Sequence, residues 1–367
     1  MKILCDRQQL QDAFGVAVGV TPTKTPKPIL TNVLLSGEGD SLELFATDLE
    51  ISVRQKIGSV KVDQPGKILL PAKEMSALLR EISDTTVSLQ SEDQRCTLEN
   101  SSGSFVLLGD DPEQYPAEIS PEGGEAFTLP SKRFLEMVRC TSFAAAREET
   151  RYAINGVLID VDAEIVRLVA TDGRRLSLSY ESIKGKAPTK KVSAVVPPRA
   201  LQALVKALPE ASSEEVEIQI GPKQISFSFG NTVLVSQLLE SRFPDYEAVI
   251  PKMADTSAEI SRDILEKKLR QVAVLSSGDV RMVSFKFEDT GLLLSAESSG
   301  VGRADVNMEV EMKGAGGTVS FNPDYLLDAL KVADKEVVCL DMSDDSAPAK
   351  FTLGEQFTYV LMPISGS

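Results

Sequence analysis

A threefold internal repeat constrains this chain more than any other feature of its sequence. Three segments align with their Ala-Leu pairs 126 residues apart each time: LPAKEMSALLREI from Leu70, VPPRALQALVKAL from Val196 and FNPDYLLDALKVA from Phe321. A second set, LELFATD, VRLVATD and LLLSAES, has its alanines 124 and 126 residues apart. Landmarks that recur in one order at nearly constant spacing predict three domains of the same kind.

Two short polar stretches mark the expected domain limits. SPEGGE at residues 120–125 and PKMADTS at residues 251–257 are typical of linkers. We therefore expect domains over residues 1–122, 126–251 and 256–367. Each copy combines segments of alternating apolar residues, typical of strands, with two segments of helical spacing. That inventory predicts an α+β fold in which antiparallel sheets pack on a pair of helices, three times over.

Composition excludes several classes of function. The chain has no histidine, so no Ser-His-Asp or Cys-His site can form within it. Its four cysteines lie far apart and form no Cys-x-x-Cys pair, so neither a zinc nor a redox motif is indicated. Carboxylate or lysine chemistry stays open on composition alone, although we expect no catalytic residue, no metal and no cofactor. The chain turns polar too early for a signal peptide, and no apolar run reaches the roughly 18 residues of a membrane span. We therefore expect a cytoplasmic protein without a membrane partner.

Two local patterns have structural interpretations. Asp48 and Asp172 recur at matching positions of the repeat, which favours turn capping over catalysis. The glycine-rich GAGG at residues 314–317 lacks the strand-loop-helix context of a phosphate-binding loop, and it is interpreted as a hairpin turn.

Charge is unevenly distributed along the chain. The net charge is −15, yet the six expected helical segments (6–19, 72–82, 131–147, 198–208, 261–276, 323–335) carry fifteen basic and ten acidic residues, which leaves −20 on the remainder. A basic helical layer in an acidic protein would suit a surface that holds DNA. Helix surfaces also carry Lys and Arg for solubility, so the asymmetry by itself leaves both interpretations open.

Seven segments, in order along the repeat, resemble the bacterial β sliding clamps, the processivity subunits of DNA polymerase III. They are KPILTNVLL (27–35), ATDLE (46–50), RYAINGVL (151–158), VATDGRRL (169–176), FPDYEAVIP (243–251), FNPDYLLDAL (321–330) and YVLMP (359–363). The resemblance covers essentially the whole chain. It implies a DNA-clamp fold and a non-enzymatic function, in which two chains close head to tail into a ring that encircles duplex DNA and tethers the polymerase.

The resemblance also implies partners and residues. The partners are duplex DNA held without sequence preference, a second copy of the chain, the DNA polymerase III alpha subunit, the clamp loader, and other DNA polymerases and repair proteins that carry a short clamp-binding peptide. The implied peptide pocket, between domains 2 and 3, contains Ile154, Thr171, Gly173, Arg174, Arg175, Leu176, Pro244, Val249, Val360, Met362, Pro363 and Ile364. The DNA-facing candidates are Lys24, Lys73, Arg80, Lys132, Arg139, Arg147, Arg199 and Lys206. The dimer-interface candidates are Phe105 and Leu107 on one chain with Val274 and Leu275 on the other.

This chain departs from the family pattern at the rim of the implied pocket. Arg174 replaces a histidine that is often found there, and Ala248 stands where a basic residue is common. The ending MPISGS has Ile364 in place of a methionine and no terminal arginine. We expect the same class of peptide with altered rim contacts. Three alternatives stay open: a metal-dependent nuclease, a repeat scaffold without a nucleic-acid role, and a specialised paralogue of the replicative clamp.

Overall fold

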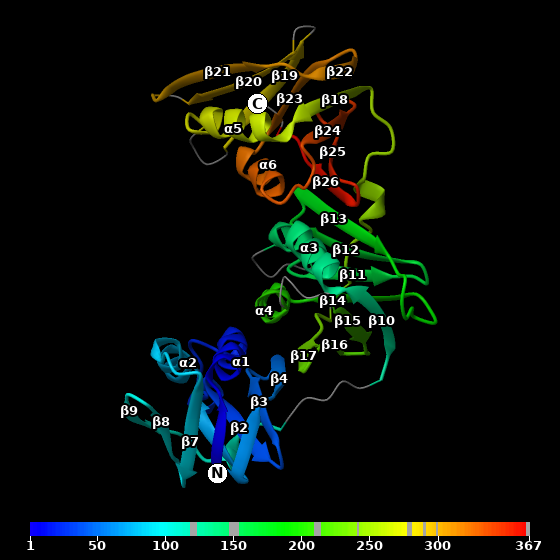
Figure 1. Ribbon diagram of the computed structural model, residues 1–367. Coiled ribbons are helices and arrows are strands. Elements are labelled where there is room, and N and C mark those ends of the chain that lie inside the picture. The colour runs from blue at the N-terminus through cyan, green and yellow to red at the C-terminus, as the bar shows by residue number, and fades with distance from the viewer. Residues whose placement is uncertain are drawn as a thin grey trace. The chain divides into compact units, whose positions relative to one another are not determined.

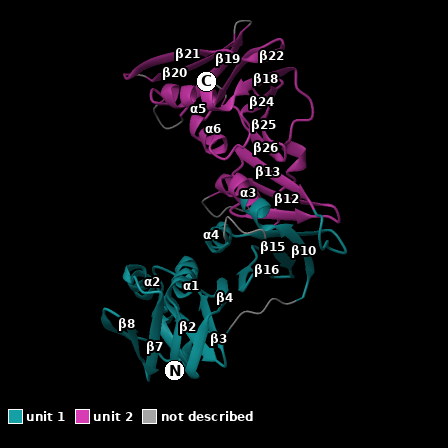
Figure 2. Cartoon of the chain, viewed as in Figure 1, with its two compact units in different colours: residues 1–135, 183–239 teal, residues 136–182, 240–367 magenta. Residues whose placement is uncertain are grey.

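The chain folds into two compact units, each made of two stretches that are far apart in sequence (Figures 1 and 2). The computed structural model describes residues 1–117, 123–146, 154–208, 214–240, 242–276, 281–288, 291–298 and 300–364. Unit 1 comprises residues 1–135 and 183–239, and unit 2 comprises residues 136–182 and 240–367. The two units do not follow the three expected domains one to one, and the domain limits stay predictions.

Unit 1 contains two antiparallel sheets. One has the strand order β5 (Val60–Gln64), β1 (Lys2–Asp6), β7 (Thr86–Glu92), β8 (Arg95–Asn100), β9 (Gly103–Leu108). The other has the order β10 (Glu125–Pro130), β15 (Glu215–Ile220), β16 (Gln224–Phe229), β17 (Thr232–Gln237), β4 (Ile51–Ile57), β3 (Ser41–Thr47), β2 (Asn32–Glu38), β6 (Gly66–Pro71). Helix α1 (Arg7–Val20) packs against α2 (Ala72–Glu81) and α4 (Pro198–Ala207). Short 3₁₀ turns, η1 (Pro28–Thr31) and η2 (Pro112–Gln114), and the strand β14 (Val192–Val196) complete the inventory of this unit.

Unit 2 has the same kind of architecture. Eight of its strands follow the order β11 (Val157–Val161), β12 (Ile165–Thr171), β13 (Arg175–Ser182), β26 (Phe357–Leu361), β25 (Ala349–Gly354), β24 (Val337–Met342), β18 (Thr256–Ser261), β22 (Glu311–Gly314). A second sheet has the order β21 (Gly302–Met308), β20 (Gly291–Ser298), β19 (Val283–Glu288), β23 (Gly317–Phe321). Helix α5 (Arg262–Ala273) packs on α6 (Pro323–Leu330) and on β20 and β21 (Figure 1). The remaining elements are η3 (Ser142–Ala144), η4 (Glu247–Val249) and α3 (Ser131–Thr141), which begins in unit 1 and ends in unit 2.

Apolar spacing places each helix on its sheet. In α5, Leu265, Leu269 and Val272 are fully buried while Lys267 and Arg270 are exposed, as the i, i+4, i+7 pattern predicts. The described part of the chain has one α-helix for each of the six expected helical segments. Antiparallel sheets covered by paired helices confirm the α+β fold class.

The repeat is visible in the strand register. Leu34 of β2 pairs with Phe45 of β3, and Leu158 of β11 pairs with Val169 of β12. Leu158 lies 124 residues after Leu34, and Val169 lies 124 residues after Phe45. The same spacing separates the alanines of LELFATD and VRLVATD. Within these strands, therefore, each residue of the first repeat corresponds to the residue 124 positions later.

Two local interpretations of the sequence are wrong. Helical spacing predicts Ala203 on the outer face of α4 with Arg199 and Lys206, but it is buried because α4 packs against both α1 and β17. The GAGG segment is a turn with positive φ at Gly314, Gly316 and Gly317, but it is not a hairpin. It joins β22, which pairs with β18, to β23, which pairs with β19 in the other sheet.

Candidate functional site

The 171–175 turn between β12 and β13 is built by its own side chains. The Thr171 hydroxyl donates to the Arg175 carbonyl at 2.6 Å and accepts the Gly173 N–H at 3.1 Å. One carboxylate oxygen of Asp172 accepts the N–H groups of Arg174 and Arg175 at 2.9 and 3.1 Å. Gly173 has φ of +84°, which favours glycine. In the matching turn of the first repeat, Asp48 accepts two backbone N–H groups in the same way, so the prediction of turn capping is confirmed.

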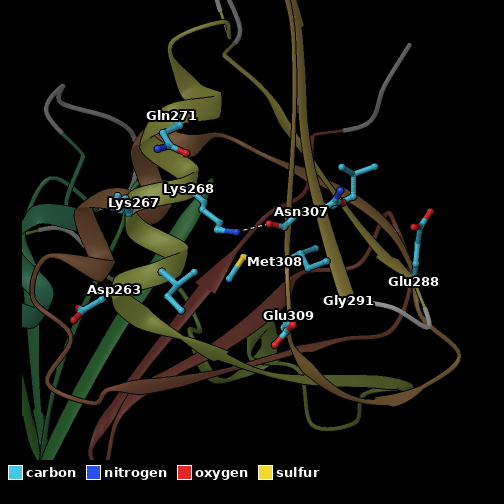
Figure 3. A pocket seen from close by; sticks show the side chains of 12 residues that line it. Asp263, Lys267, Lys268, Gln271, Glu288, Gly291, Asn307, Met308 and Glu309 are labelled. Carbon is cyan, nitrogen blue, oxygen red and sulfur yellow. Dashed lines mark hydrogen bonds between the residues drawn. The ribbon is translucent and has the colours of Figure 1, made fainter.

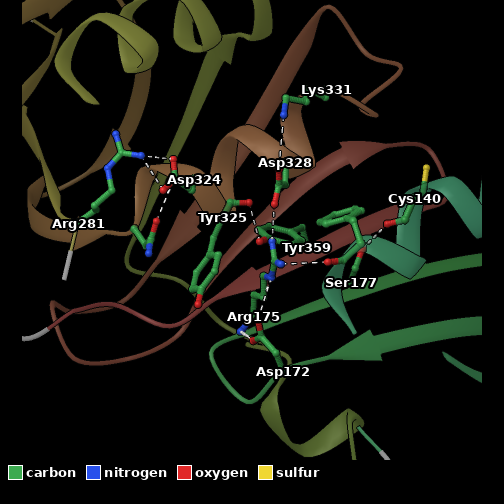
Figure 4. Close-up of polar contacts among 12 residues, drawn as sticks. Cys140, Asp172, Arg175, Ser177, Arg281, Asp324, Tyr325, Asp328, Lys331 and Tyr359 are labelled. Atoms are coloured by element: carbon green, nitrogen blue, oxygen red, sulfur yellow. Dashed lines mark hydrogen bonds and ion pairs between the residues drawn. The ribbon is translucent and has the colours of Figure 1, made fainter. Parts of the chain in front are cut away.

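Arg175 anchors this turn to the rest of unit 2 (Figure 4). Its guanidinium donates to Asp172 and to Asp328 of α6, each at 3.1 Å, and to the Phe143 carbonyl at 3.0 Å. The same group lies over the Tyr325 ring, 4.4 Å from the centroid. Arg175 is 8 % exposed, so a charge removed from water is compensated by two carboxylates and an aromatic face. These contacts leave Arg175 a structural cation rather than a free receptor for anions.

A loop facing this turn, the wall segment (residues 243–250), is held by two buried aromatic rings. Phe243 and Tyr246 are 9 % and 8 % exposed. The Tyr246 hydroxyl donates to a carboxylate oxygen of Asp160 on β11 at 3.1 Å. Burial, with the adjacent Asp160 carboxylate, raises the pKa of Tyr246 well above its usual value, so the hydroxyl remains a donor at neutral pH.

The turn, the wall segment and the end of β26 enclose a cavity of about 270 Å³ within unit 2. It is lined by Ile154, Thr171, Gly173, Arg175, Leu176, Pro244, Asp245, Tyr246, Val249, Val360 and Met362. Most of the lining is apolar, and Val249 and Met362 are 46 % and 40 % exposed at its surface. A small apolar hollow with partly exposed hydrophobic edges can accept aliphatic or aromatic side chains from another molecule.

Nine of the twelve expected pocket residues line this cavity, and three do not. The side chain of Arg174 is exposed, and its carbonyl accepts the Met362 N–H at 2.9 Å. Pro363 and Ile364 leave the cavity because the Ile364 N–H donates to the Ser320 carbonyl at 2.8 Å, which directs the chain along β23. Sequence reasoning missed Asp245 and Tyr246, although both belong to the FPDYEAVIP segment. Both residues have polar groups, and apolar patterning does not assign such residues to the lining of an apolar pocket.

Most expected DNA-facing residues are exposed. Lys24 lies in the loop before η1, and the others that the structure places on the surface of helices are Lys73, Arg80, Lys132, Arg139 and Lys206. Arg147 lies outside the described residues.

The Arg199 guanidinium makes two contacts within unit 1. It pairs with the Asp48 carboxylate and donates to the Val20 carbonyl at 2.8 Å, so it ties α4 to the β3–β4 turn and to the end of α1. The Asp48 carboxylate therefore compensates part of the Arg199 charge, and its place among the DNA-facing residues stays a prediction.

The expected interface residues lie at unpaired sheet edges or helix ends. Strand β9 is the edge of its sheet, where Phe105 is 38 % and Leu108 70 % exposed. Leu107 is half-buried. Val274, just after α5, is 74 % exposed, and Leu275 is half-buried.

A larger hollow of about 1010 Å³ lies between α5 and strands β20 and β21 (Figure 3). Its lining mixes Lys267 and Lys268 with Asp263, Glu288 and Glu309. The Lys268 ammonium donates across it to the Asn307 carbonyl. Mixed charge and an engaged lysine give this hollow no clear chemical preference.

Within the described ranges, no group of three or more Cys, Asp or Glu side chains is arranged to hold a metal ion. No helix in that part of the chain is both long and apolar enough to cross a membrane.

Comparison with known proteins gives matches along the whole chain. Three family profiles match: DNA polymerase III beta subunit, N-terminal domain (residues 1–120), central domain (128–245) and C-terminal domain (247–365). The beta sliding clamp of Chlamydia trachomatis serovar D is 32 % identical over 99 % of this chain and 87 % of its own length. That of Escherichia coli K12 is 28 % identical over 99 % of this chain and 100 % of its own.

Solved structures agree with these matches. The Pseudomonas aeruginosa sliding clamp bound to griselimycin has a TM-score of 0.94 and 27 % identity, with both chains fully covered. The DNA polymerase III beta subunit of Thermotoga maritima, at 24 % identity, has the same fold with a TM-score of 0.94.

Proposed function

The chain belongs to the DNA polymerase III beta subunit family of sliding clamps. From that premise we propose a role for each of its surfaces: the dimer interface, the DNA-facing residues and the cavity of unit 2. Two copies close head to tail into a ring around duplex DNA. Partner proteins, among them the polymerase III alpha subunit, the clamp loader, and other polymerases and repair proteins, insert a short peptide into the cavity of unit 2. The observation that carries this proposal is the cavity itself, with apolar walls and partly exposed edges.

Ring closure uses two different surfaces of each chain. One is the open edge at β9 with Phe105, Leu107 and Leu108, and the other lies around Val274 and Leu275 at the end of α5. An unpaired edge strand with exposed apolar side chains favours pairing with another chain. A head-to-tail contact between unlike surfaces forms a closed ring when its rotation closes.

DNA is held topologically rather than by high affinity. The exposed basic residues Lys24, Lys73, Arg80, Lys132, Arg139 and Lys206 make weak contacts to phosphates. Such contacts are independent of sequence and weaken with salt, which permits sliding. A ring therefore reconciles a net charge of −15 with a DNA function. The proposed function contains no chemical step. The protein acts in the cytoplasm, where the replication machinery works.

The cavity takes the apolar part of a peptide in which glutamine precedes a Leu/Phe pair. Ile154, Leu176, Val360 and Met362 form apolar surface suited to these side chains. Arg175 keeps the turn in place and is neutralised by Asp172 and Asp328, so an acidic anchor residue gains little there.

The test of the ring is retention on DNA. The protein is loaded by a clamp loader onto nicked circular DNA, the circle is linearised, and retention is measured by gel filtration. Retention on circles that is lost on linear DNA is the expected result, because a ring slides off an open end. Equal retention on both forms indicates ordinary binding and contradicts the proposal, as does a lack of retention with the loader matched to this clamp.

A further inference from the structure

We propose that Asp160 is a positioning residue for the unit 2 cavity. Its carboxylate holds the Tyr246 hydroxyl away from the 171–175 turn, and the cavity stays open to a partner's side chains as a result. The inference rests on the proposed function for its consequence, peptide binding. The positioning itself follows from comparing two repeats of this chain, because the matching tyrosine of the first repeat has different hydrogen-bond partners.

The matching tyrosine is Tyr115. It lies in Tyr-Pro-Ala-Glu-Ile after the last strand of the first repeat, as Tyr246 lies in Tyr-Glu-Ala-Val-Ile after the last strand of the second. The strand register, shifted by 124 residues, makes Thr47 the counterpart of Thr171 and Ser36 the counterpart of Asp160. The two environments can therefore be compared position by position.

In the first repeat the tyrosine closes over its turn. The Tyr115 hydroxyl accepts the Thr47 N–H at 3.2 Å and donates to the Asn32 carbonyl at 2.8 Å. Its ring stands edge-on to Phe45 with centroids 5.8 Å apart, and Leu69 completes a buried cluster there. Tyr115 thus occupies the space against the residue whose counterpart, Thr171, lines the cavity of unit 2.

In the second repeat the hydroxyl is bonded elsewhere. Tyr246 donates to Asp160, whereas the counterpart of Asn32 is Gly156, four residues earlier in the chain and just before β11 begins. Asn32 and Ser36, the counterpart of Asp160, lie about 13 Å apart along β2, so the two hydroxyls are anchored at different positions of their repeats. Tyr246 then forms part of the cavity lining together with Pro244 and Val249, instead of covering the turn.

The residue type at position 160 is hard to explain by packing alone. All five residues of β11 are buried, and Asp160 is 5 % exposed. A buried carboxylate costs free energy unless it is hydrogen-bonded and its charge is compensated. Tyr246 supplies a hydrogen bond, and Arg167 lies directly across the strand pair. The first repeat has the smaller, neutral Ser36 at this position, where no tyrosine needs an anchor.

The experiment uses the full-length chain and four variants. Asp160→Ala removes the acceptor, Asp160→Asn keeps an acceptor oxygen without the charge, and Tyr246→Phe removes the donor. Tyr115→Phe is the matched control, because it removes the corresponding hydroxyl from a buried tyrosine outside the cavity. Affinity is measured by fluorescence anisotropy with a labelled synthetic peptide that carries glutamine followed by a Leu-Phe pair. Amide hydrogen exchange of residues 242–250 is measured on the same samples without peptide, and thermal unfolding reports stability.

We expect Asp160→Ala and Tyr246→Phe to weaken peptide binding by roughly tenfold, since each breaks a buried hydrogen bond to a charged group. Both variants should speed exchange in the wall segment, including the Val249 amide, which donates to the Tyr246 carbonyl. Asp160→Asn should restore affinity to within about twofold of the parent. Tyr115→Phe should change neither quantity in the wall segment, although it lowers the unfolding temperature.

Two results would overturn the inference. One is parent-like peptide affinity and exchange in Asp160→Ala, and the other is an equal loss of affinity in Tyr115→Phe, which would indicate general destabilisation. If the parent itself does not bind the peptide, the proposed function of the cavity fails. The exchange of the wall segment then still decides whether Asp160 positions it.

Discussion

Replacing Gly173 with leucine tests the cavity and the repeat together. Gly173 lines the cavity with φ of +84°, and a Cβ added there meets no heavy atom within 4 Å. The first repeat carries Leu49 at the corresponding position with φ of +83°, so a leucine is compatible with this turn. Gly173→Leu should therefore fold and project a side chain into the open space at the cavity.

The expected magnitudes follow from strain and from lost burial. A left-handed conformation costs a non-glycine residue roughly 1–2 kcal/mol. For a unit of this size that corresponds to a fall in unfolding temperature of roughly 2–8 °C. A partner peptide that can no longer bury one leucine side chain loses roughly 1.5–3 kcal/mol, so its affinity should fall by about tenfold to a hundredfold.

The assay combines thermal unfolding with anisotropy of the labelled glutamine-Leu-Phe peptide. Leu49→Gly is the matched control: it relieves the same strain in the first repeat, should raise the unfolding temperature by a similar amount, and should leave peptide affinity unchanged. A folded Gly173→Leu variant that binds the peptide as the parent does would refute the assignment of this cavity as the peptide site.

Three further outcomes are expected. Leu108→Glu should convert the dimer to a monomer in sedimentation velocity, because it places a charge on the exposed β9 edge, and an unchanged dimer would exclude that edge from the interface. The hydrogen bond from Arg167 lowers the pKa of Asp162 to about 2, so its stabilisation is present above about pH 4 and is lost as the pH falls toward 2. Asp162→Asn should therefore lower the unfolding temperature by about 2 °C at pH 7, after allowance for solvent screening, and this difference from the parent should disappear in acid melts. Burial raises the pKa of Cys5 to about 12 and of Cys96 to about 11, so neither should react with iodoacetamide at pH 8 until the protein unfolds, as mass spectrometry can check.

Local and periodic features of this protein could be predicted from its sequence. The threefold repeat, the six helical segments and the buried face of α5 depend on spacing along the chain. So does turn capping by Asp48 and Asp172, whose hydrogen bonds reach residues only two or three positions away. Such contacts form wherever the local backbone adopts the turn, and the residue pattern therefore specifies them.

The apolar pocket residues came from a resemblance and not from spacing. Nothing local in TDGRR, FPDYEAVIP or YVLMP indicates that they meet in one cavity. The same limit applies to Arg199, which on its helix is an outward-facing cation and whose ion pair the residue pattern does not indicate. Its partner Asp48 is 151 residues away, and only the packing of α4 near the β3–β4 turn brings them together.

The sequence by itself determined the repeat, the element types and the caps, because these depend on neighbours along the chain. Tertiary structure alone decided which matching residues of the repeats have different hydrogen-bond partners. Tyr246 reaches the Asp160 side chain across 86 residues and Arg175 reaches Asp328 across 153, whereas Tyr115 bonds to the backbone of Thr47 and Asn32. One repeat thereby has an open cavity where the other has a closed turn. The physical reason is that hydrogen-bond partners for buried polar groups are assigned by three-dimensional proximity, which chain spacing does not encode.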